Sequence, residues 1–147
     1  MSEWKEIQSE SDIDEVMETL GDFHDSCIVS VNYKSGVFVD EKNDMCFGSA
    51  NERELTVLFH CQWEPKVFEL CFTGVRQMHL VGWQKNYLAS ISEAALFFCD
   101  NILPGTPSRL IVWSDYDYFT VSGSKGPIKE PADTYIIANS LKWRTIE

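Results

Sequence analysis

The sequence predicts an α+β fold: a predominantly antiparallel β-sheet of about seven to nine short strands with one N-terminal helix. Only one segment repeats its apolar residues at the helical period, and it lies near the N-terminus. The later segments alternate polar and apolar residues and are rich in β-branched and aromatic side chains. No helical pattern recurs between them, which favours antiparallel pairing in a curved sheet or partial barrel over repeated βαβ units.

The chain has 147 residues, of which 44% are hydrophobic. A chain of this size and composition buries enough apolar surface to offset the entropy lost on ordering. No internal repeat or linker-like stretch divides it, so we expect residues 1–147 to form a single domain.

The helix is expected from Asp12 to Leu20. Its apolar residues share one face at helical spacing: Ile13, Val16, Met17 and Leu20. Ser11 is the expected N-cap, and Gly21 is placed where a left-handed residue would end the helix.

Two short alternating segments, Ile28–Tyr33 and Val37–Val39, flank Lys34-Ser35-Gly36 and predict a β-hairpin. Val29, Val31 and Tyr33 would share one face of its first strand. Residues 40–52 are polar and contain turn signals on both sides of Met45-Cys46-Phe47.

The strongest strand pattern runs from Glu54 to Trp63, where the odd-numbered positions are apolar, which predicts a half-buried strand. A turn at Glu64-Pro65-Lys66 leads into a strand from Val67 to Thr73. Gly74 then predicts a bulge or bend before Val75–Val81.

Residues 87–99 fit either a helix or one or two strands, and we favour strand. Arg109–Trp113 predicts a strand, and a turn at Ser114–Asp117 leads into another at Tyr118–Ser122. A polar loop over residues 123–133 precedes a last strand from Thr134 to Arg144, whose apolar odd positions should share a face: Tyr135, Ile137, Leu141 and Trp143.

The formal net charge is −11, and the first 25 residues hold nine acidic residues against the single Lys5. Such a field repels nucleic acids and anionic lipid surfaces, whose binding needs clustered lysine and arginine. We therefore expect no nucleic-acid partner, whereas a basic protein partner is compatible with this charge.

The five cysteines are odd in number and widely spaced without a C-x-x-C motif, so we expect reduced thiols and no disulfide framework. The acidic start lacks the features of a secretory signal, and no stretch approaches the roughly 20 apolar residues that span a bilayer. These observations predict a cytoplasmic protein that does not cross a membrane.

Four residues are candidates for chemistry in a pocket: His24, Asp25, His60 and Cys71. Asp25 could set the tautomer of His24, although such a pair is more often structural. His60 and Cys61 should face opposite sides of their strand, whereas a turn at Pro65 could bring Cys71 across the ladder from His60.

No histidine pair has the spacing of a zinc site, and the phosphate-loop, nucleophile-elbow and dinucleotide motifs do not occur in the sequence. We therefore predict no metal, no cofactor and no catalytic residue. Whether the chain is an enzyme stays open at this point, with a non-catalytic role favoured.

Two exposed patches are predicted to bind a partner. Asp14, Glu15 and Glu18 lie off the apolar face of the helix, and Asp115, Tyr116 and Asp117 form an aromatic and acidic turn. The alternative is that this turn is merely solvated while Trp113 and Phe119 enter the core.

Three short motifs carry a resemblance to a known group: Phe23-His24-Asp25-Ser26, Phe72-Thr73-Gly74-Val75 and the segment Ala138–Arg144. Together they resemble small bacterial immunity proteins of polymorphic toxin systems and related uncharacterised families. The resemblance implies a cytoplasmic protein that binds and blocks a toxin without catalysis of its own. The resemblance does not identify any residue of this chain as a binding residue.

The leading hypothesis is thus a non-catalytic protein-binding module, an immunity-type inhibitor with a basic partner such as a toxin domain. The alternative is a small-ligand-binding protein or an enzyme with a pocket in the curved sheet. A homodimer is a third hypothesis, because exposed strand edges readily pair.

Overall fold

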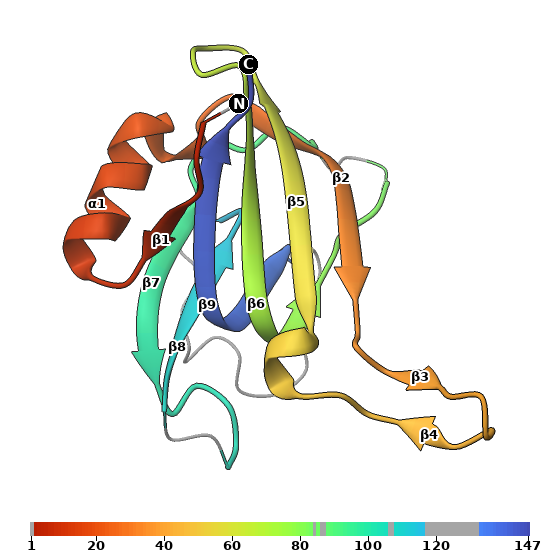
Figure 1. Cartoon of the computed structure of the whole chain (residues 1–147). Coiled ribbons are helices and arrows are strands. Elements are labelled where there is room, and N and C mark those ends of the chain that lie inside the picture. The colour runs from red at the N-terminus through yellow and green to blue at the C-terminus, as the bar shows by residue number, and fades with distance from the viewer. Residues whose placement is uncertain (1, 84, 86–87, 106–107, 117–132) are drawn as a thin grey trace.

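The fold is that of a computed structural model, which describes residues 2–83, 85, 88–105, 108–116 and 133–147. Half of the chain is strand and a single α-helix is present among these residues, which confirms the predicted α+β fold (Figure 1). Seven of the strands form one antiparallel sheet in the order β2-β5-β6-β9-β8-β7, with β1 paired to β9. The sheet is strongly curved but is not closed into a barrel.

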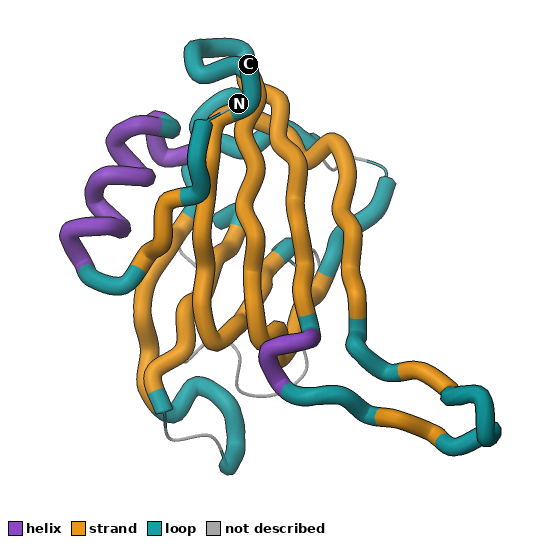
Figure 2. Tube along the Cα trace, in the orientation of Figure 1, coloured by secondary structure: helices purple, strands orange, loops and turns teal. Residues whose placement is uncertain are grey.

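Seven strands make up this sheet: β1 (Lys5–Ile7), β2 (Ser26–Lys34), β5 (Glu54–Cys61), β6 (Val67–His79), β7 (Ala95–Asp100), β8 (Arg109–Ser114) and β9 (Tyr135–Thr145). Two further short strands, β3 (Phe38–Val39) and β4 (Met45–Cys46), pair with each other outside it. Figure 2 shows how far they project from the rest of the strands.

Helix α1 (Glu10–Thr19) begins two residues earlier than the sequence indicated. Its N-cap is Ser9 instead of Ser11: the Ser9 hydroxyl accepts a hydrogen bond from the Asp12 amide. The Asp12 carboxylate in turn accepts from the amides of Gln8 and Ser9, and the Gln8 contact is the largest cause of a lowered pKa for Asp12. The reciprocal capping box explains the start. The predicted inner face is confirmed by Ile13, Val16 and Leu20.

The predicted hairpin of Ile28–Tyr33 with Val37–Val39 is wrong. β2 pairs along its length with β5, and β3 pairs only with β4. The local pattern suggested a turn at Gly36, but the chain instead leaves the sheet there and reverses at Asp40. The Asp40 carboxylate accepts hydrogen bonds from the amides of Lys42 and Asp44, an arrangement that closes the turn.

The paired strands β6 and β9 are the longest in the sheet, and both change face near Gly74. Gly74 has φ of +69°, and the register shifts between Val75 and Gln77, which confirms the predicted bend. As a result Leu141 and Trp143 face the main core, whereas Tyr135 and Ile137 pack in a second cluster. The expectation that these four residues share one face is therefore wrong.

Residues 88–94 carry a single bridge, between Ile91 and Ser26, and β7 starts only at Ala95. Among the described residues of the ambiguous segment 87–99, the expected strand is therefore found only at the end, from Ala95 onward. The predicted strand Tyr118–Ser122 and most of the loop after it lie outside the described residues.

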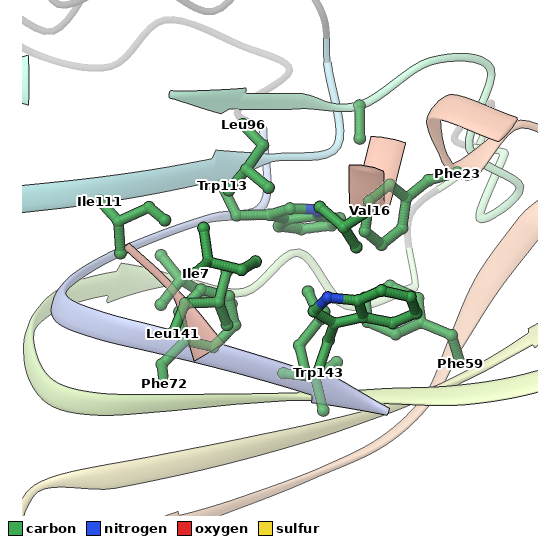
Figure 3. Close-up of a cluster of buried hydrophobic side chains, with 14 of the residues drawn as sticks. Ile7, Val16, Phe23, Phe59, Phe72, Leu96, Ile111, Trp113, Leu141 and Trp143 are labelled. Atoms are coloured by element: carbon green, nitrogen blue, oxygen red, sulfur yellow. The ribbon is translucent and has the colours of Figure 1, made fainter. Parts of the chain in front are cut away.

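The main core lies between the two halves of the curved sheet, with α1 packed against β1 and β7 (Figure 1). At its centre four aromatic rings meet with centroids 5.1–5.6 Å apart: Phe23, Phe59, Phe68 and Trp113. Figure 3 shows Phe23 and Val16 beside Trp113, so the helix and the following turn reach the same cluster.

The capping box gives a test of the helix start. Ser9→Ala should lower the free energy of unfolding by about 1 kcal/mol, because the amide of Asp12 loses its acceptor. Ser11→Ala is the matched control and should leave stability nearly unchanged. Urea denaturation of both variants measures the difference, and equal losses would contradict the assignment of Ser9 as the cap.

The bend at Gly74 gives a second test. A Cβ at this position would collide with the Asn139 side chain and would also require an unfavourable left-handed conformation. Gly74→Ala should therefore destabilise the chain by roughly 2 kcal/mol or more. Gly82→Ala, where nothing lies within 4 Å, is the control in the same thermal and urea measurements. A neutral Gly74→Ala would show that the bend does not depend on glycine.

Candidate functional site

The turn between α1 and β2 holds the His24–Asp25 pair in a constrained backbone. Asp22, Phe23 and Asp25 have φ of 55°, 64° and 62°, which non-glycine residues rarely adopt. The full burial of the Phe23 ring anchors this turn, and the backbone of Asp25 donates to Ile91. The surrounding packing therefore imposes the strained geometry and fixes where β2 begins.

Both ring nitrogens of His24 face protein oxygens. Nδ1 lies 2.7 Å from the Ser92 carbonyl oxygen and Nε2 lies 3.2 Å from Asp25 Oδ2. The same carboxylate oxygen accepts a hydrogen bond of 2.7 Å from the Trp63 indole. The pair thus links the start of β2 to two other segments. These contacts fit the structural role that the sequence analysis considered for His24 and Asp25.

A shallow pocket of about 250 Å³ lies beside this pair, between the end of α1 and the turn after β5. Its lining includes Glu18, His24, Cys61 and Trp63. Cys61 Sγ is 3.6 Å from the carbonyl oxygen of His24 and within reach of the Trp63 amide, so its contacts are structural as well.

The structure does not bring His60 and Cys71 together. His60 lies opposite Cys27 and Val67, whereas Cys71 lies opposite Thr56 and Lys142, four positions along the ladder. At about 3.4 Å per residue this separation is far beyond hydrogen-bond reach. Burial raises the pKa of the Cys71 thiol, which disfavours the nucleophilic thiolate.

The two predicted partner patches do not form one surface. Asp14, Glu15 and Glu18 lie on α1, on the side of the molecule opposite β2, and Glu15 is 3.4 Å from Lys5 (Figure 1). Asp115 and Tyr116 follow β8 instead. Asp117 lies outside the described residues.

Asp115 is held by the segment that precedes β9. Its Oδ1 accepts a hydrogen bond from the Thr134 amide, and its own amide donates to the Thr134 carbonyl. The Thr134 hydroxyl accepts from the amide of Val81, which ties the end of β6 to the same place. Tyr116 is exposed, as the sequence predicted for this turn, while Trp113 is fully buried.

A surface that the sequence interpretation missed follows β2 and the segment after it. We call residues 37–47, which include β3 and β4, the apolar arm. The exposed large apolar side chains on β2 and the apolar arm are Val29, Val31, Tyr33, Val37, Phe38, Val39, Met45 and Phe47. Two apolar triplets in the sequence mark the arm: Val37-Phe38-Val39, assigned above to a hairpin strand, and Met45-Cys46-Phe47 in an otherwise polar stretch.

A second pocket, of about 260 Å³, lies along β2. One wall is formed by Ile28–Val31, and the facing wall by Leu80 and Val81 after β6. Ala89 and Ile91 line it as well, and Asp115 and Thr134 supply its polar groups. Of the sequence-predicted site residues that the structure describes, only Asp115 lines this pocket.

Among the described residues, no group of three or more histidine, cysteine or acidic side chains is arranged to hold a metal ion. In the same part of the chain, α1 is too short and too polar to cross a bilayer, and no other helix qualifies. Searches found no match to this chain among protein-family models, curated proteins or solved structures. The resemblance to immunity proteins stays a prediction.

The buried position of Cys71 predicts low thiol reactivity. At pH 8, iodoacetamide should modify Cys71 of the folded chain at least roughly tenfold more slowly than Cys46, which is half buried on the apolar arm. Peptide mass spectrometry over a time course measures both rates, and labelling in urea provides the control. Modification of Cys71 as fast as Cys46 would restore it as a candidate nucleophile.

Proposed function

We propose that this chain is a non-catalytic protein-binding module that uses β2 and the apolar arm as its binding surface. The observation that carries the proposal is the exposure of Phe38, Met45 and Phe47, which are 56%, 57% and 66% accessible. These three side chains lie within ten residues of each other on a projecting two-stranded arm (Figure 2). Clustered exposed aromatics and methionine are typical of protein interfaces.

The arm is suited to a partner because it adds little to the core of its own chain. Its strands pair only with each other within the described residues, and none of its side chains belongs to either core cluster. Apolar residues in such a place cost solubility without stabilising the fold, so a partner that covers them accounts for their presence.

The more specific form of the proposal is an immunity-type inhibitor that acts in the cytoplasm on a basic partner such as a toxin domain. Its support is the net charge of −11, which speeds association with a cationic surface, together with the sequence resemblance described above. Five free thiols are typical of a reducing compartment.

The exposed arm allows a direct test. The immobilised full chain should retain a stoichiometric protein from lysate of its source, and the affinity of that purified protein is then measured by calorimetry. Phe38→Ser with Phe47→Ser should weaken binding roughly 30-fold or more, because both rings are lost from the centre of the interface. The circular dichroism and melting temperature should be nearly unchanged, since both side chains are exposed.

The control is the neutralised helix, Asp14→Asn with Glu15→Gln and Glu18→Gln, on the far side of the molecule. It should slow association at low salt through weaker steering and have little effect at high salt. Unchanged affinity of the arm variant would remove the arm from the interface, and failure to retain any stoichiometric protein would count against a binding module.

A further inference from the structure

Among the residues that the structure describes, none pairs with the outer edge of β2 over most of its length. β5 pairs with one side of the strand, and on the other side the described residues provide only the bridge from Ser26 to Ile91. Residues 29–34 are exposed, and Lys34 is the only charged residue of the strand. Exposed edges of this length normally carry charges or prolines that prevent pairing with another chain. This one carries an apolar alternation instead.

The pocket along β2 lies where it would contact the side chains of a strand that pairs with this edge. Val31 lies opposite Val57, a core residue, so its side chain points toward the inner face of the sheet and into the pocket lining. A strand paired with β2 directs alternate side chains to the same face. At least one of them would enter the space between β2 and residues Leu80 and Val81. Backbone pairing supplies affinity in this mode, and the pocket supplies selectivity.

We propose that the free edge of β2 binds an extended segment of a partner protein, which adds as a strand, places an apolar side chain in the pocket and carries lysine or arginine at its ends. The inference rests on the proposed function and names the part of the partner that is recognised. An aliphatic side chain suits the pocket, whose walls are largely aliphatic: Ile28, Val29, Val31, Leu80, Val81, Ala89 and Ile91.

Charge decides the chemistry of the flanks. Asp25 lies just before β2, and Asp40, Glu41 and Asp44 lie on the arm beyond its other end, where the cations are Lys34 and Lys42. The backbone amides of Asp44 and Lys42 hold the pKa of Asp40 below its usual range, so this carboxylate is ionised at neutral pH. Basic residues on both sides of the apolar centre would meet these carboxylates.

The same charge disfavours a second copy of this chain as the occupant. Antiparallel pairing of two β2 edges would bring together two molecules of net charge −11 and would set the acidic arm of each near the other chain. The negative electrostatic field of the chain attracts a cationic partner segment, whereas it repels a second copy of the chain. A foreign strand is therefore favoured over self-pairing.

The test uses the full chain, labelled with ¹⁵N, and a synthetic peptide of the same length as β2 in which valine and threonine alternate between paired lysines. Titration should shift the amide signals of residues 28–34 and of Leu80, Val81, Ala89 and Ile91. A peptide N-methylated at every valine and threonine keeps the charge and side chains but loses the backbone donors of its apolar centre, and it should bind at least roughly tenfold more weakly.

Two substitutions on neighbouring positions separate the pocket from general charge effects. Val31→Lys places a positive charge on the face of β2 that lines the pocket, whereas Asn32→Lys places the same charge on the opposite face of the strand. Val31→Lys should weaken peptide binding at least roughly tenfold and Asn32→Lys by no more than about twofold. Melting curves of the two variants confirm that both fold.

The inference would be overturned by peptide-induced shifts that map to α1 instead of β2, by equal binding of the N-methylated peptide, or by equal effects of the two lysine variants. A dimer in sedimentation equilibrium that Val31→Lys dissociates would assign the edge to a second copy and also overturn it. If a captured partner loses affinity on substitution of Phe38 and Phe47 but not on Val31→Lys, the proposed function stands and this inference fails.

Discussion

The joint bend of β6 and β9 determines most of this structure. At Gly74 and at the register shift after Val75 both strands invert their alternation, so that Phe72 and Val75 face the same core. A single sheet thereby folds over itself and encloses the aromatic cluster without a second sheet. β5 pairs only with the part of β6 before the bend, and β2, which pairs with the other side of β5, lies at an outer edge of the sheet.

The turn before β2 couples that edge to the core. Phe23 packs in edge-to-face contact with Phe59, Phe68 and Trp113, and such ring pairs stabilise a core beyond the area they bury. Their packing energy offsets the strained backbone of Asp22 and Phe23. The rigid turn gives β2 a fixed start, and a strand held at one end presents its free edge in a single register.

Sequence patterns predicted the elements better than their pairing. The helix face and the alternation of β5 depend on local periodicity, and both are confirmed by burial. The hairpin at Gly36 failed because alternation does not say which strand is the neighbour, and β2 finds its partner across the whole arm. The odd-position face of β9 failed because the bend at Gly74 arises from pairing with β6. For the site, Tyr116 is exposed as predicted, whereas Asp115 is half buried through its contacts with Thr134. The surface on β2 was missed because an exposed face of a strand has the same pattern as a buried one.

An open apolar edge is a liability for a single chain, since identical edges pair and aggregate. Here the net charge of −11 opposes that outcome, because repulsion between like molecules acts before their edges can meet. At physiological salt, screening removes this repulsion at separations beyond about 8 Å, so it acts mainly when two edges are about to meet. A cationic segment meets no such barrier. The acidity of the chain and the unprotected edge of β2 are thus two parts of one arrangement: the charge selects against self-pairing, and the edge supplies the contact for a partner of opposite charge.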